Sequence, residues 1–178
     1  LEGVNMAGAN LTGVNFRRGL EIGQNPKEAV EVLRQNVTGS NFAGATLVGA
    51  DALGADFSGS NLAGANLQDA ALADCQLVSV DLSGADLGGA TLSGANLVGA
   101  ELSGANLAGA TLAGANLTDA HLHGVDLTGV EVFGANVAMA NLAAEPAGAL
   151  QPMNEAEIRA ALGQHRRWVG GGAGPPGN

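Results

Sequence analysis

An apolar residue recurs at every fifth position through most of this chain, and no standard secondary-structure element has a period of five. The recurring residue is leucine in every unit from Leu62 to Leu127, and it weakens to valine before the last unit at Leu142. From Phe42 to Leu142 there are about 21 consecutive units, so the sequence is a repeat array.

The period excludes both a helix and a straight strand. In an α-helix, leucines five residues apart would rotate around the axis, because a helical stripe needs spacings of three and four. In a straight strand they would alternate between the two faces. If the chain turns a corner in every unit, all leucines can point inward together with the small residue two positions earlier, and the glycine that usually follows supplies the turn. The sequence therefore predicts an all-β solenoid whose leucines fill the bore.

Units such as Ala95-Asn96-Leu97-Val98-Gly99 and Ala105-Asn106-Leu107-Ala108-Gly109 resemble the A(N/D)LXX repeats of the pentapeptide-repeat family. The resemblance implies a right-handed quadrilateral β-helix with four units, and so twenty residues, per coil. Neighbouring coils would lie about 4.8 Å apart. Stacked at this period, the expected core ladder consists of Leu62, Leu82, Leu102, Leu122, Leu67, Leu87, Leu107 and Leu127.

Residues 1–16 form the first predicted coil, and residues 17–36 interrupt the repeat. In this interruption Asn25 suits a helix N-cap, Pro26 the first helical turn and Glu28 the capping box, which predicts a short helical insertion. It is either a tolerated surface insertion or a functional loop on a rigid scaffold. The sequence starts already in repeat register, so we expect a fragment of a longer chain.

The predicted β-helix covers residues 37–142, followed at 143–169 by a linker and a C-terminal helix. Ile158, Leu162 and Trp168 share one face of this helix. Because a solenoid end exposes its core, we expect the helix to cap it. The alternatives are a homodimer through this helix and a connection to a further domain. Residues 170–178, rich in glycine and proline, are predicted to be disordered, and their formal G-x-G-x-x-G follows no strand and opens no helix.

The charge of the chain is strongly acidic, with 17 acids, 7 bases and a formal net charge of −10. No lysine or arginine stands between Val37 and Leu142, which disfavours direct binding of nucleic acid by the solenoid faces. Some pentapeptide-repeat proteins are DNA mimics that occupy the DNA-binding saddle of type II topoisomerases. The resemblance to this family therefore implies DNA gyrase as one candidate partner. The acids fall on all four expected faces without forming a stripe, which suits solubility as well as mimicry.

An outward-facing set of side chains is the candidate interaction surface. Phe133 follows an inward position and should face outward, where either the C-terminal segment or a partner would cover it. The full candidate set is Asp81, Glu101, Asp86, Asp126 and Phe133.

Catalytic chemistry finds little support in the sequence. His121 and His123 should both face outward beside Glu101, but a zinc site would need a third converging ligand, so we expect solvated histidines that relieve carboxylate repulsion. Cys75 takes a small inward position and should behave as a buried apolar residue. We predict no enzyme activity, no metal and no cofactor.

One unit departs from the pattern, because Ala52 takes the inward position and Leu53 stands beside it. Either the bore narrows at this unit or a bulge brings Leu53 inward.

The sequence therefore predicts a non-enzymatic scaffold for an unidentified protein partner. The alternatives are a DNA mimic and a structural module of a larger protein. No signal peptide and no apolar run of about 18 residues is visible, so we expect a cytoplasmic protein without membrane insertion.

Overall fold

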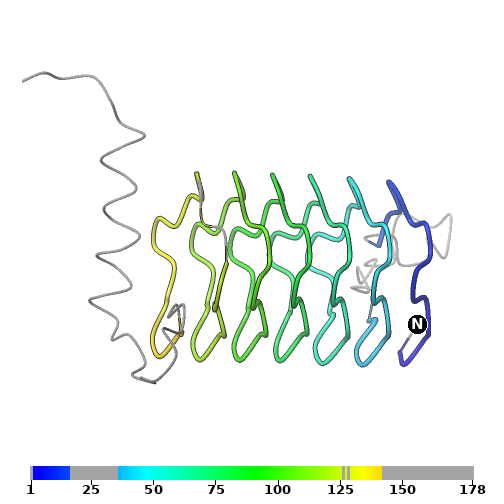
Figure 1. The fold of residues 1–178 in the computed structure, drawn as a ribbon, viewed down its shortest axis with the longest axis horizontal. Coiled ribbons are helices and arrows are strands. Elements are labelled where there is room, and N and C mark those ends of the chain that lie inside the picture. The colour runs from blue at the N-terminus through cyan, green and yellow to red at the C-terminus, as the bar shows by residue number, and fades with distance from the viewer. Residues whose placement is uncertain (1, 17–35, 126, 128, 142–178) are drawn as a thin grey trace, which may run out of the picture.

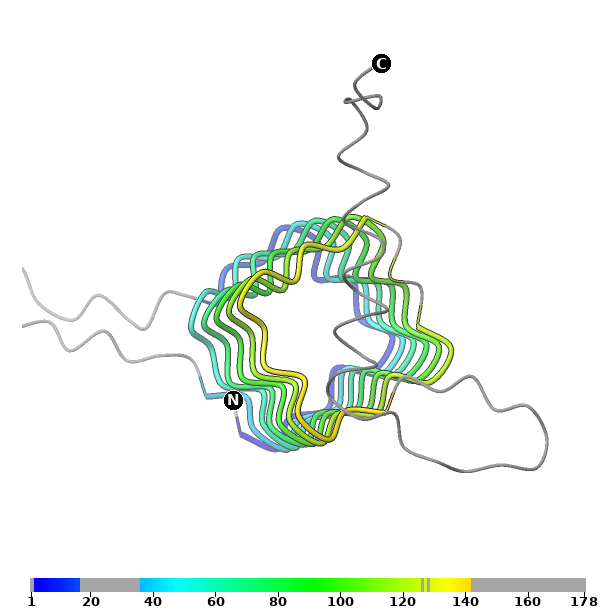
Figure 2. The same ribbon diagram turned by 90° about the vertical axis from the view of Figure 1, so that its left-hand side faces the viewer.

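The structure, a computed structural model, describes residues 2–16, 36–125, 127 and 129–141. The described chain winds into a stack of coils along one axis (Figure 1), and each coil is four-sided when viewed along that axis (Figure 2). The regular elements in these residues are single parallel β-bridges, which run from Asn5↔Asn41 to His121↔Asn141. Because Asn61 pairs with Asp81 and Asp81 pairs with Glu101, one coil spans twenty residues. The predicted quadrilateral β-solenoid is confirmed.

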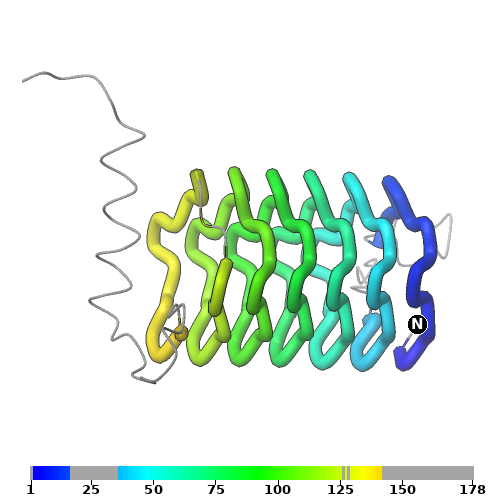
Figure 3. The backbone as a smooth tube through the Cα atoms, in the orientation of Figure 1, coloured from blue at the N-terminus to red at the C-terminus, as the bar shows by residue number. Residues whose placement is uncertain are grey.

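Backbone hydrogen bonds join each coil to the next and also close each corner. The N–H of Leu62 donates to the carbonyl of Asp81 in the following coil, with an N···O distance of 2.7 Å. The corner is closed within the unit, where the N–H of Ala65 donates to the carbonyl of Leu62 at 3.0 Å. This pattern repeats through the stack, so the path of the tube in Figure 3 is nearly the same in every coil.

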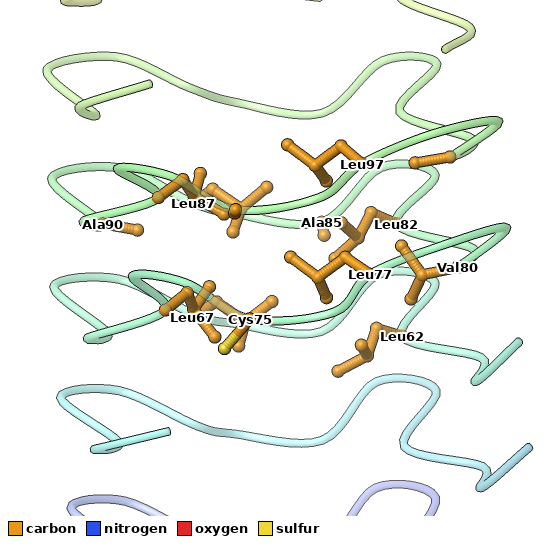
Figure 4. Packing of buried hydrophobic residues seen from close by; sticks show 14 of the residues in the cluster. Leu62, Leu67, Cys75, Leu77, Val80, Leu82, Ala85, Leu87, Ala90 and Leu97 are labelled. Carbon is orange, nitrogen blue, oxygen red and sulfur yellow. The ribbon is translucent and has the colours of Figure 1, made fainter. Parts of the chain in front are cut away.

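The core consists of stacked leucine columns lined by small residues. Figure 4 shows Leu62 and Leu82, from successive coils, one above the other on the inner side of the wall. The structure buries most of the expected ladder, with exposed fractions of 4% or less for Leu62, Leu67, Leu82, Leu87, Leu102, Leu107 and Leu122. Leu127 is only partly buried, near the end of the described stack.

A cluster of phenylalanine rings fills the bore at the unit where the leucine pattern fails. Asn15 pairs with Asp51, so Phe16 lies over Ala52. The Phe16 ring lies 5.5 Å from that of Phe57, and Phe42 completes an edge-to-face cluster. Of the two alternatives predicted for this unit, the bulge is wrong, because Ala52 is buried and its N–H keeps the regular bond to the carbonyl of Ala71 at 2.9 Å. Leu53, next along the chain, is half-buried on the outer side.

The described residues on either side of the insertion belong to the same coil. Asn15 pairs with Asp51 and Asn36 pairs with Asp56, so the two asparagines occupy consecutive positions around the first coil. Asn36 therefore belongs to the coil rather than to the insertion.

Several predicted segments lie outside the described residues. These are the insertion helix, the C-terminal helix with Ile158, Leu162 and Trp168, and the tail at 170–178, all of which remain predictions. In the described part of the chain, no helix is long and apolar enough to cross a membrane.

Candidate interaction surface

The residue before each inward leucine is held in place by the corner that follows it. Where this residue is asparagine, aspartate or Glu101, its side-chain oxygen commonly accepts a hydrogen bond from the backbone N–H two residues later. Asp81 accepts from Ser83 at 3.0 Å, and Asp86 accepts from Gly88 at 3.1 Å. Glu101 has the longer side chain but accepts in the same way from Ser103, at 2.9 Å. The carboxylates are therefore fixed to the scaffold rather than freely rotating.

Three of the candidate carboxylates flank one corner, which we call the acidic corner and define by Asp81, Asp86 and Glu101. Asp81 and Asp86 lie in one coil on neighbouring faces, separated by the corner at Gly84. Glu101 pairs with Asp81 in the following coil. The sequence has no lysine or arginine from residue 37 to residue 142. The acidic corner is therefore not neutralised by a lysine or arginine of these coils.

Neutral amides contact Asp86, and a histidine contacts Glu101. Asp86 accepts hydrogen bonds from the side-chain amides of Asn106, at 3.0 Å, and Gln68, at 2.7 Å. Glu101 lies 2.8 Å from Nδ1 of His121, and the His121 side chain is 63% exposed. The predicted placement of a solvated histidine beside Glu101 is thus confirmed.

The pKa of the Glu101 carboxyl lies below its ordinary value of 4.5. Partial desolvation raises the pKa, but hydrogen bonds with Ser103 and His121 and the charge of His121 together outweigh it. Glu101 is therefore ionised at neutral pH.

Phe133 does not belong to the acidic corner. Glu131 pairs with Thr111, which pairs with Thr91, and this column runs along the face opposite Asp81 and Glu101. Phe133 follows in the same unit and is 71% exposed. The candidate set therefore does not form one surface, and Asp126 lies outside the described residues.

Sequence reasoning missed other features of the outer surface. Met139 is 69% exposed at a corner with a left-handed backbone, and Gln68 reaches from one coil to Asp86 in the next. The twenty-residue stacking could have revealed the Gln68 contact, because the two residues are eighteen apart and lie on one face.

Metal-binding and thiol chemistry have few candidates in the described chain. No group of three or more histidine, cysteine, aspartate or glutamate side chains suited to a metal ion occurs in that part. The Cys75 side chain is buried and its thiol donates to the carbonyl of Ala52.

Comparison with known proteins gives one match to a family. A family model described as pentapeptide repeats matches eight copies, over residues 1–18, 40–77, 75–112 and 95–137. No curated protein is significantly similar to the chain.

Solved structures of pentapeptide repeat proteins resemble the chain over much of its length. A protein from Nostoc PCC 7120 is 36% identical over 56% of this chain and 85% of its own, with a TM-score of 0.48. One from the Arabidopsis thaliana thylakoid lumen is 30% identical over 71% and 76%, with a TM-score of 0.31. Trypsin-treated QnrB1, a plasmid-mediated fluoroquinolone resistance protein, is 21% identical over 80% and 72%, with a TM-score of 0.39.

Proposed function

Because the chain belongs to the pentapeptide-repeat family, whose members form right-handed quadrilateral β-helices and are generally structural or interaction proteins, we propose that it is a non-enzymatic scaffold for a protein partner. The acidic corner is the observation that carries the proposal. Its carboxylates are tied to backbone N–H groups, so binding a partner costs little side-chain entropy.

The chemistry of the acidic corner favours a partner with a basic surface. Half-buried carboxylates without neighbouring lysine or arginine still attract cationic groups and speed up encounter with them. Salt screens such charges over about 10 Å at 0.1 M ionic strength, so binding should weaken as salt is added.

Capture on the immobilised chain tests this proposal with two matched variants. The variant D81N/D86N/E101Q removes the charges of the acidic corner but keeps each side-chain oxygen that accepts the backbone bond. The control D56N/D74N/E131Q removes the same number of charges elsewhere on the solenoid. We expect a specific partner to bind the wild type and the control and to lose at least tenfold in affinity for the corner variant. Equal binding to both variants would contradict the assignment.

A DNA mimic that acts on DNA gyrase is the second candidate. The same acidic corner, which has no lysine or arginine beside it in the repeat sequence, favours this function. Mimicry predicts that the chain inhibits supercoiling by purified gyrase and that the corner variant loses inhibition while the control keeps it. Unchanged supercoiling at a large excess of the chain would exclude this candidate.

A structural module of a larger protein is the remaining alternative, and recovery of no specific partner would favour it. We further propose that the C-terminal helix caps the solenoid or joins two copies in a homodimer, and that the protein is cytoplasmic.

A further inference from the structure

The column of outward side chains that includes Asp81 and Glu101 continues with a histidine. In successive coils this column holds Asn61, Asp81, Glu101, His121 and Asn141. The Nδ1 atom of His121 lies 2.8 Å from Oε2 of Glu101, and the His121 side chain is 63% exposed. A titratable ring is therefore in direct contact with one carboxylate of the acidic corner and is open to protons from the solvent.

The contact with Glu101 determines which ring nitrogen of His121 carries the proton in the neutral state. An ionised carboxylate only accepts hydrogen bonds, so the neutral ring must donate through Nδ1. Nε2 is then the nitrogen that gains a proton when the ring becomes charged. Protonation therefore adds a positive charge without breaking the contact, and the hydrogen bond becomes charge-assisted on both sides.

Glu101 is the carboxylate that the His121 ring contacts within the described part of the chain. The neutral residue Asn141 pairs with His121 from the following coil. In the coil of His121 itself, Asp119 occupies the corner two residues before it, and the exposed His123 lies two residues after it. A proton taken up by His121 therefore places its charge next to Glu101, with Asp119 and His123 as the other titratable neighbours in its coil.

The charge of a protonated His121 also acts on Asp81 through space. Asp81 lies two coils from His121, which is about 10 Å along the axis of the solenoid. Salt screens charges over about 10 Å at 0.1 M ionic strength but only over about 30 Å at 0.01 M. At low salt, one positive charge at His121 therefore offsets part of the negative potential of the whole acidic corner.

From this arrangement we propose that His121 regulates the acidic corner, because protonation of its ring in mildly acidic solution weakens the binding of a cationic partner. The inference rests on the proposed function, since it concerns the same surface. Histidine is the side chain whose ordinary change of charge falls between about pH 5 and pH 8, so the regulation acts close to physiological pH.

The test measures the binding of a synthetic lysine-only peptide to the full chain by isothermal titration calorimetry. Lysine side chains stay charged at both about pH 7.5 and about pH 5.5, so the charge of the peptide is constant. At low salt we expect the dissociation constant of the wild type to rise about fivefold at the lower pH, as one added charge at this separation predicts. In H121N the rise should be less than about twofold, because the added charge is gone. Asparagine already occupies this column at Asn61 and Asn141, so H121N suits the fold.

The matched control is H123N, which removes the other histidine of the same unit and should keep most of the pH dependence of the wild type. Equal pH dependence in the wild type and H121N, or equal losses in the two histidine variants, would overturn the inference. The corner variant D81N/D86N/E101Q at the higher pH separates two kinds of failure. If it binds the peptide as well as the wild type does, the proposed function fails together with the inference. If it binds more weakly while H121N keeps the pH dependence, the inference alone fails.

A second measurement follows the His121 ring directly. Nitrogen-15 nuclear magnetic resonance of the labelled full chain distinguishes the two neutral forms of the ring. We expect the proton on Nδ1 above the titration and Nε2 as the nitrogen that titrates. A neutral ring with its proton on Nε2 would contradict the contact with Glu101 and refute the inference.

Discussion

At the scale of single residues, the volume of one side chain in the bore decides which neighbour is tolerated. Ala52 is small because Phe16, from the coil before, lies over it and packs edge-to-face with Phe57. The sequence showed that the unit was unusual, but a five-residue pattern carries no information on contacts between coils. The choice between a narrow bore and a bulge therefore needed the structure.

The variant Ala52→Leu tests this packing. We expect it to lower the free energy of unfolding by about 1–3 kcal/mol, because the added atoms overpack the ring cluster. In the Ala52→Leu background, Phe16→Leu should cost less than it does in the wild type. Urea unfolding of the four proteins gives the coupling, and strictly additive losses would show that the two side chains do not compete for space.

The lowered pKa of Glu101 makes a second prediction at this scale. Its folded pKa lies below its unfolded value of 4.5, so the ionised carboxylate contributes stability that is present above that pH and is lost as the pH falls through the folded pKa. Glu101→Gln should therefore be slightly less stable than the wild type near neutral pH, with a difference that shrinks in acid. The effect is small because the Glu101 side chain is 36% exposed. Thermal unfolding at a series of pH values measures it, and a difference that does not vary with pH would contradict the assignment.

At the scale of the element, the corner permits a side chain in only some coils of a column. Asp69 occupies a left-handed corner with a φ of 57°, and the next corner in its column is Gly89. A Cβ atom on Gly89 would clash with the carboxylate of Asp69, whereas a Cβ atom on Gly109, one coil further, would meet nothing within 4 Å. A side chain at Gly89 therefore needs Asp69 to shift, in addition to the left-handed backbone at Gly89 itself.

The pair Gly89→Ala and Gly109→Ala separates these two requirements. Both glycines have a positive φ, of 68° and 69°, so each substitution should cost about 1–2 kcal/mol for the left-handed conformation. We expect Gly89→Ala to cost more, and the excess to disappear in the Asp69→Gly background. Denaturant unfolding is the measurement, and equal costs at the two glycines would show that Asp69 moves aside freely.

At the scale of the whole molecule, the coil is the unit that can be removed. Each coil contacts only its neighbours, so stability is close to a sum over coils and the junctions between them. Deletion of residues 91–110, one complete coil, should leave a cooperatively unfolding solenoid of lower melting temperature. Deletion of residues 91–108 shifts the leucines out of their columns and should abolish the transition seen by circular dichroism. Similar melting of the two deletions would contradict the twenty-residue coil.

The period of five was enough to predict the solenoid and its buried leucines, because one bend in every unit is the arrangement that keeps Leu62 and Leu82 on the inner wall. It was not enough to define the interaction surface. Phe133, Asp81 and Glu101 all face outward, and only the path around the coil shows that the unit of Phe133 lies on the face opposite the two acids. Whether a side chain points outward depends only on its position within the five-residue unit. Which side chains share a surface depends on how the units stack into coils.

The most direct test of the central claim is nuclear magnetic resonance measurement of through-space contacts between backbone protons. The coil predicts contacts that join Asn96 to Gln76 on one side and to Asn116 on the other, and the same twenty-residue step along every column. Contacts between residues three and four apart at Leu97, Leu102 and Leu107, as in a helix, would contradict the coil and everything inferred from its faces.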